Sequence, residues 1–185
     1  MKSIAVLGLG IIALTTGAFI TAGEAGTGSA SPAARGSYFE AAVDGGVSAR
    51  PSGDVAFGVV GDTASGVASF AITLDAGDSS GAILITSLDG RLPAPGRYPL
   101  SETAGSEGFR ASYIAGSPLR PSGLFRAERG TLEITTSTPE RIGGHFSFTA
   151  AGFHATDPSD EGSEVTVTGA FMSTLPPVVA TGAHP

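Results

Sequence analysis

The chain has 185 residues, and its 17 acidic against 10 basic side chains give it a formal net charge of −7. It contains no cysteine, so it forms no disulfide and cannot be lipid-anchored through a cysteine after its N-terminal segment. An acidic surface repels nucleic-acid phosphates and anionic lipids, which argues against nucleic acid as a partner and against a membrane once that segment is removed.

The N-terminal segment has the pattern of a secretory signal peptide. Residues 4–22 carry no charge, they follow Lys2, and small residues come next. We expect cleavage after Ala25, with Ala30 as a second site, and therefore a protein that is secreted, either extracellular or periplasmic. The uncharged run approaches the ~20 residues that span a bilayer, so a retained membrane anchor is the alternative.

The rest of the chain divides into one patterned domain and two flanks. Residues 26–36 and 176–185 are rich in small residues and proline, and we predict that both are disordered, the first as a linker and the second as a tail. Residues 37–175 have the length of one ordinary domain, which is enough to bury a core without disulfides.

Apolar residues recur at every second position from Ser37 onward, which is typical of strands with one face in a core and one in water. Phe70, Ile72 and Leu74 illustrate the pattern. Turn residues separate such segments at roughly the eight-to-twelve-residue spacing of an all-β sandwich or barrel. The predicted strands are residues 37–43, 54–60, 66–74, 82–88, 109–114, 130–137, 141–151 and 163–172.

Two proline-containing segments are interpreted separately. Residues 92–100 look extended, but their three prolines lack amide donors, so we predict an edge strand or a crossover there. Two copies of Arg-Pro-Ser-Gly, at residues 50–53 and 120–123, are interpreted as turns.

A hairpin is predicted at the centre of the fold. Pro139 lies in a polar connection that would pair residues 130–137 with 141–151, and Phe146 and Phe148 would bury large areas against the facing sheet. Short connections favour antiparallel neighbours. The sequence therefore predicts a single antiparallel all-β domain of about eight strands, a β-sandwich or a β-barrel, because the inward pattern is the same for both.

The motif Gly77-Asp78-Ser79-Ser80-Gly81 has the G-x-S-x-G spacing that presents a nucleophilic serine in some hydrolases. That use needs a helix after the motif, whereas strand-like residues 82–88 follow it here. We interpret the motif as a hairpin turn between residues 66–74 and 82–88. No catalytic residue, cofactor-binding residue or cofactor is predicted.

Histidine and carboxylate side chains offer one weak metal candidate. By strand alternation, His145 points away from the face that holds Phe146 and Phe148, as an ordinary surface residue does. His154 lies in an acidic segment whose carboxylates could hold Ca²⁺ or a transition metal, although the spacing of an EF-hand is absent. The weak candidate ligands are Asp157, Asp160, Glu161 and Glu164, and the favoured interpretation is a solvated acidic loop.

Four phrases follow one another in a familiar order: GRYPL, GTLEIT, RIGGHFSFTA and VTVTGAF, at residues 96–100, 130–135, 141–150 and 165–171. Together they resemble an uncharacterised family, a domain of unknown function, of secreted or lipid-anchored bacterial all-β proteins. Residues 39–45 resemble the opening strand of that family. The resemblance implies a bacterial envelope or extracellular β-domain and brings no catalytic residue, and the lipidated cysteine with which many members begin is missing here.

These observations favour a secreted, non-catalytic cell-envelope or extracellular β-domain, binding or structural, whose partner is a protein or envelope component. Such a protein should expose an apolar patch or an unprotected edge strand. One alternative is a lipocalin-like carrier of a small apolar ligand, with a cavity lined by Phe57, Phe70 and Phe146. A distant alternative is a hydrolase that uses carboxylates.

We predict that the protein isolated from its own host begins at Gly26, because the small residues before it suit signal peptidase. An intact mass spectrum with N-terminal sequencing checks this. A mass that retains residues 1–25 would instead support the membrane anchor.

Overall fold

The computed structural model describes residues 36–62, 67–77, 80–105, 107–117, 119–154, 162–174 and 180–181. No helix that could cross a membrane occurs in these ranges. The strands in chain order are β1 (Ser37–Gly45), β2 (Ser52–Asp62), β3 (Val67–Asp75), β4 (Ala82–Ser87), β5 (Gly96–Leu100), β6 (Arg110–Ser117), β7 (Arg120–Thr138), β8 (Arg141–His154), β9 (Ser163–Ser173) and β10 (Ala180–Thr181).

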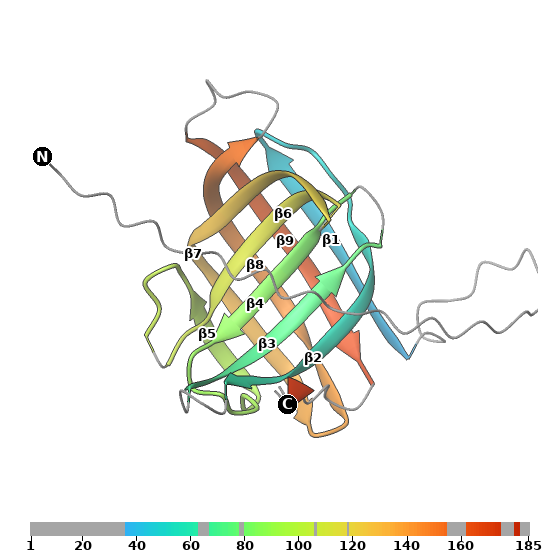
Figure 1. Ribbon diagram of the computed structural model, residues 1–185, viewed down its shortest axis with the longest axis vertical. Helices are drawn as coiled ribbons and strands as arrows, with labels where there is room; N and C mark the ends of the chain where they lie inside the picture. Colours follow the sequence, from blue (N-terminus) through green and yellow to red (C-terminus); the bar gives the residue numbers. More distant parts are fainter. Residues whose placement is uncertain are drawn as a thin grey trace, which may run out of the picture.

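Eight of these strands close into a barrel. The order around the wall is β1-β9-β8-β7-β6-β4-β3-β2, and pairing of β1 with β2 closes the ring (Figure 1). All neighbours within this ring are antiparallel. The predicted fold class, an antiparallel all-β domain of about eight strands, is confirmed, and the architecture is the barrel.

The predicted central hairpin is confirmed and is longer than expected. β7 and β8 pair from Gly123 opposite His154 to Thr138 opposite Arg141, and the turn between them contains Pro139. β7 begins ten residues before the predicted strand at Gly130, because its first part pairs with β6 and its second part with β5. A single strand therefore has two different neighbours on the same side.

Proline positions explain two further details. β5 lies off the closed path and pairs with β7 alone, so the predicted edge strand is confirmed. The second Arg-Pro-Ser-Gly copy lies inside β7, and its prediction as a turn is wrong. Pro121 is tolerated there because it is paired with Gly116, where a register shift interrupts the β6–β7 ladder.

Two β-bulges interrupt the pairing of β7 with β8, one between Ala127 and Arg129 and one between Ile134 and Thr136. Beyond an extra residue in one strand, the odd- and even-numbered positions of that strand exchange their inward and outward directions. Phe125 and Ala127 are buried before the first bulge, and Leu132 and Ile134 are buried after it. Both halves of β7 therefore face apolar side chains into the barrel.

Aromatic and branched side chains fill the barrel interior. The rings of Phe146, Phe148 and Phe171 have centroids 6.1 and 6.4 Å apart, and Phe57 and Phe70 form another pair at 6.4 Å. All five are at most 4 % exposed, as the alternation of their strands predicts. A Cβ on Gly169 would lie 2.5 Å from the Phe146 ring, so the packing requires glycine at that position.

The chain ends differ in how far the structure describes them. The predicted signal peptide, residues 1–25, lies outside the described residues. The tail, predicted to be disordered over residues 176–185, includes β10, whose Ala180 and Thr181 pair in parallel with Val60 and Gly61 of β2.

We predict that Phe148→Ala lowers the free energy of unfolding by about 3–5 kcal/mol, because it leaves a cavity in a close-packed interior. Phe153→Ala is the matched control on the same strand. Its side chain is 55 % exposed, and it should change stability by no more than about 0.5 kcal/mol. Urea unfolding followed by circular dichroism measures both, and equal effects would contradict the inward and outward assignment of β8.

Candidate interaction face

The G-x-S-x-G motif lies in the connection between β3 and β4. Asp75 pairs antiparallel with Ala82, so the predicted hairpin is confirmed, although Asp78 and Ser79 lie outside the described residues. Gly81 has a φ of +114°, and a Cβ there would lie 2.6 Å from the carbonyl oxygen of Ile114. The motif supplies the turn that the chain needs to reverse direction.

A buried tyrosine holds that turn against the barrel. The hydroxyl of Tyr113 on β6 donates a hydrogen bond to the carbonyl oxygen of Ser80 at 3.1 Å. Its ring stacks on Phe125 of β7 with centroids 6.0 Å apart, and only 1 % of the residue is exposed. Burial in this apolar surrounding raises the pKa of the Tyr113 hydroxyl above its usual value of 10.0.

The predicted metal candidates are divided between described and undescribed parts of the chain. Asp157, Asp160 and Glu161 lie outside the described residues. Glu164 is exposed at the start of β9, where its Oε2 lies 3.9 Å from Nη2 of Arg129. Within the described ranges no group of three or more His, Asp or Glu side chains could hold a metal ion. The exposed His145 points outward, as predicted.

The expected lining of a ligand cavity is part of the packed core. Phe57, Phe70 and Phe146 all belong to the buried cluster. Two shallow hollows of the described residues open on the outer wall instead, one over β4, β6 and β7 and the other over β7 and β8. Both of these hollows therefore lie on the outside of the barrel.

Charge is unevenly distributed over the barrel wall, with both signs present in the second part of β7 at Glu128, Arg129 and Glu133. The sequences of the adjacent strands β9, β1, β2 and β3 contain six Asp or Glu and no Arg or Lys. The sequences of β4, β6 and β8 and of residues 120–127 in β7 contain four Arg and no Asp or Glu. We call the outer surface of this second group of strands the basic face.

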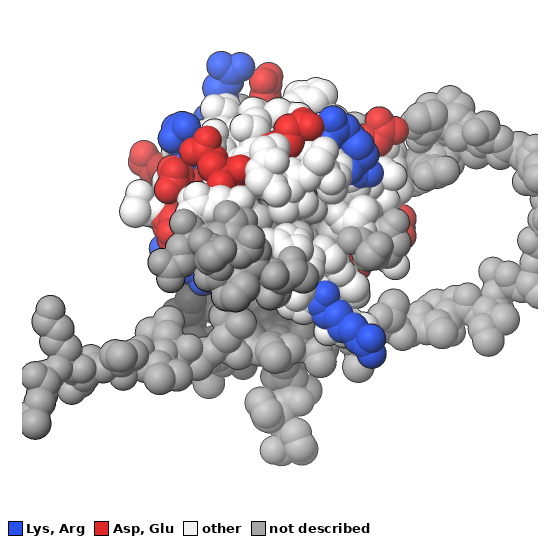
Figure 2. Space-filling view, turned by 90° about the horizontal axis from the view of Figure 1, so that it is seen from above, with Lys and Arg blue, Asp and Glu red and all other residues white. Residues whose placement is uncertain are grey.

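The charge division belongs to the wall and not to the end of the barrel. Seen from above, acidic and basic side chains are interspersed wherever the surface is not covered by grey atoms (Figure 2). No large patch of basic side chains alone is visible on that end, where a polyanion could bind.

An apolar row crosses the basic face. Ile114 on β6 is paired with Leu124 on β7, and Leu124 is paired with Phe153 on β8. These three positions point outward, where alternation places polar residues, and Phe153 is 55 % exposed. Leu119, in the turn between β6 and β7, is 92 % exposed. The row is a cluster of apolar side chains that the core of this domain does not use.

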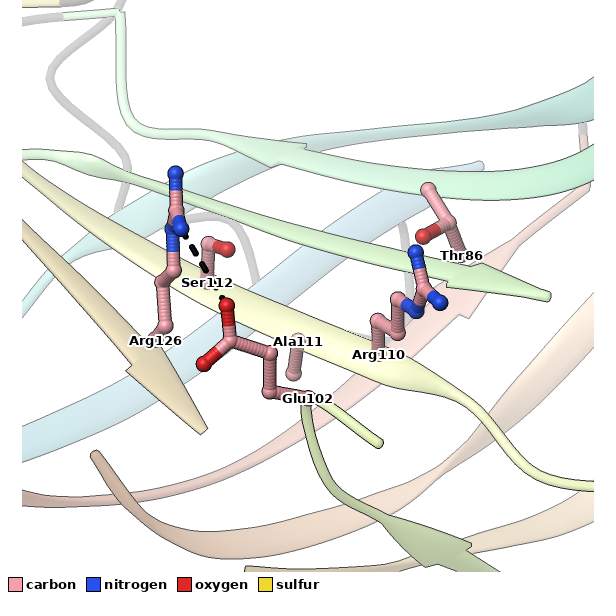
Figure 3. Close-up of a pocket in the computed structure, with 6 residues that line it drawn as sticks. All are labelled: Thr86, Glu102, Arg110, Ala111, Ser112 and Arg126. Carbon is pink, nitrogen blue, oxygen red and sulfur yellow. Dashed lines mark hydrogen bonds and ion pairs between the residues drawn. The ribbon is translucent and has the colours of Figure 1, made fainter. Parts of the chain in front are cut away.

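Part of the basic face next to the row is hollowed and lined mainly by polar residues. The hollow has a volume of about 270 Å³ and is lined by Thr86, Glu102, Arg110, Ala111, Ser112 and Arg126. The guanidinium of Arg126 contacts the carboxylate of Glu102 at 3.1 Å, while Arg110 and Thr86 lie on the other side of that carboxylate (Figure 3). Both partners of this ion pair are more than half exposed, so water and other anions can compete for it.

The backbone fixes these groups more firmly than the ion pair does. Ser112 is paired with Arg126, and Thr86 is paired with Arg110, so four of the lining side chains come from the barrel ladder itself. The amide of Glu102 donates to the carbonyl oxygen of Ala127 at 2.8 Å, which ties the segment after β5 to the bulge of β7. The hollow therefore offers two guanidinium groups and two hydroxyls from a rigid wall.

Comparison with known proteins adds no relative, because no family model, no curated protein and no solved structure matches the chain. The resemblance to secreted bacterial β-proteins therefore stays a prediction.

Sequence reasoning missed the basic face. Leu124 and Arg126 belong to a segment that was not predicted to be a strand, and the outward placement of Phe153 is visible only once β8 is known to extend past residue 151. Counting charges strand by strand would have found the division, but only after the order of strands around the barrel was known.

We predict that Tyr113→Phe costs about 0.5–1.5 kcal/mol near neutral pH, because the hydrogen bond to the Ser80 carbonyl is lost. A folded-state pKa raised above 10.0 means that the unfolded chain loses this proton first, so the wild type loses stability as pH rises above 10. The variant lacks that loss, and the stability gap should shrink at alkaline pH. Urea unfolding of both proteins at pH 8 and above pH 10 tests this, and a constant gap would contradict it.

Proposed function

We propose that this protein is a secreted, non-catalytic β-barrel domain that binds a protein of the cell envelope or extracellular space through its basic face. The observation that carries the proposal is the outward-pointing apolar row Ile114–Leu124–Phe153, in which Phe153 is exposed and Ile114 and Leu124 are half-buried, on a wall whose interior is already filled. Exposed apolar clusters beside polar groups mark binding surfaces more often than they mark free protein surface.

The composition of the row suits the centre of an interface. A few apolar side chains, with an aromatic ring among them, supply most of the affinity of a typical complex, while surrounding polar contacts exclude water. Phe153 supplies the ring, and the flanking Arg110 and Arg126 supply the polar surround. Arginine and aromatic residues are also the types enriched in such interfaces.

The alternatives find less support. A carrier of small apolar ligands needs an enclosed cavity, and Phe57, Phe70 and Phe146, which would line it, are packed in the core. A carboxylate-based hydrolase needs two opposed carboxylates, and the hollow of Figure 3 has one, Glu102.

Site-specific photo-crosslinking in the native host tests the proposed function. A benzoylphenylalanine at position 153 should yield one crosslinked envelope or extracellular protein, whereas the same residue at position 168 should yield none. Thr168 is the matched control because it is exposed on β9, on the acidic half of the wall. Adding Leu124→Ser next to position 153 should reduce the yield, since it removes part of the row.

Two outcomes of this crosslinking would contradict the proposed function. Equal crosslinking yields at positions 153 and 168 would show that host proteins contact the barrel wall without specific binding to the row. A bare, uncrosslinked protein at both positions would mean that the row binds no protein in the host.

A further inference from the structure

We infer that the partner docks on the basic face through an extended acidic segment, in which an apolar side chain is followed at alternate positions by carboxylates. This inference rests on the proposed function, because it names the chemistry of the partner at the same face. Three observations carry it: the local charge, the spacing of groups along β6, and the hollow that receives an anion.

The local charge is opposite to that of the whole chain. The protein has a net charge of −7, yet Arg110, Arg120 and Arg126 lie on the strands of the basic face, and Glu102 is the one carboxylate among the residues that line the hollow. Arg110 forms no ion pair within the described residues. A segment that brings carboxylates to this face therefore gains attraction where the remaining wall would repel it.

The spacing of groups along β6 selects an extended segment. Its outward positions run from Ile114 through Ser112 to Arg110, and each step of two residues covers about 7 Å. The cross-strand partners Leu124 and Arg126 repeat the same apolar-then-polar order on β7. The side chains of an extended partner segment also alternate every two residues. If one apolar side chain of that segment lies over Ile114 and Leu124, the next two side chains on the same side of the segment lie over the hollow.

The chemistry of the hollow suits a carboxylate. Guanidinium groups present paired donors in a plane that matches a carboxylate, and Arg110 and Arg126 reach the hollow from opposite sides (Figure 3). Ser112 adds a hydroxyl donor beside Arg126, and Thr86 adds another beside Arg110 (Figure 3). The exposed pair of Arg126 with Glu102 can open to admit the incoming anion, because a pair of this exposure is weakly held.

Other occupants fit less well. Two copies of this chain carry −7 each and repel one another at long range. An anionic membrane or a nucleic acid would meet three arginines but would also meet the repulsion of the acidic half of the wall. An extended peptide covers only the basic face, and it is the occupant that avoids the acidic strands.

Fluorescence anisotropy with labelled synthetic peptides tests the inference on the purified full-length mature protein. The probe is a peptide with one copy of the sequence Leu-Ser-Glu-Ser-Glu, in which Leu and both Glu share one face of an extended chain, and the two comparison peptides replace its Glu by Lys or its Leu by Ser. We expect the first peptide to bind about tenfold or more tightly than either comparison peptide. Its affinity should fall when ionic strength rises from about 0.01 M to about 0.15 M, since the Debye length shortens from about 30 to about 8 Å.

Charge-reversed variants locate the binding. Arg110→Glu and Arg126→Glu should each weaken binding of the Leu-Ser-Glu-Ser-Glu peptide about tenfold or more, and Phe153→Ser should also weaken it. Arg91→Glu is the matched control, with the same change in net charge at an exposed residue outside the basic face. Thermal unfolding of each variant confirms that the barrel is intact.

The outcomes separate this inference from the proposed function. If crosslinking from position 153 captures a protein but the Lys peptide binds as well as the Glu peptide, the acidic chemistry is wrong while the binding face stands. Equal loss in Arg91→Glu and Arg126→Glu would also overturn the inference. A crosslinked dimer of this chain, or binding to phosphatidylglycerol vesicles in place of the peptide, would replace the acidic segment with a second copy or a lipid surface.

Discussion

The bulge between Ala127 and Arg129 is the constraint on which both the core and the basic face depend. Before it, odd-numbered residues of β7 point inward, so Phe125 stacks on Tyr113 while Leu124 and Arg126 point to solvent. After it, Leu132 and Ile134 take over the interior. Without this one extra residue, one half of β7 would turn its apolar side chains outward, because a shift of one position exchanges the two faces of a strand.

The bulge also explains what could be predicted from the sequence. Strands with unbroken alternation, such as β3 and β9, were placed to within one residue at each end. The first half of β7 was missed because its alternation is out of step with that of residues 130–137, and because Pro121 and Gly123 have the composition of a turn. Proline in a strand is allowed where the ladder shifts, and the sequence of one strand does not show where its ladder with a neighbour shifts.

The choice of a barrel and the position of the face depended on contacts between residues far apart in the chain. Closure requires Phe39 of β1 to meet Gly53 of β2 while β1 also pairs along its length with β9. An alternating strand has the same pattern in a sandwich and in a barrel, so no local pattern contains this information. Likewise, Ile114, Leu124 and Phe153 are ordinary single apolar residues in the sequence and form a row only through the register.

A filled interior changes the meaning of the outer surface. In a barrel that encloses a ligand, the lumen is where specificity lies, and the outside can remain featureless. Here the interior is filled by the side chains of the core. The outward positions of the wall are therefore the ones available to contact another molecule. Of those positions, the apolar ones carry a cost, because exposed apolar side chains promote association of the protein with itself.

In the proposed complex, the arginines beside the row limit that cost and favour an acidic partner at the same time. Charged residues that flank an apolar segment oppose self-association, and Arg110 and Arg126 flank the row on the side of the hollow. Although the chain has a net charge of −7, Arg110 and Arg126 attract a carboxylate locally. A partner with apolar residues alone would bury these guanidinium groups without compensation, which is costly, whereas an acidic partner satisfies them. In the proposed complex, the arginines that oppose self-association of the row therefore also favour an acidic partner over an apolar one.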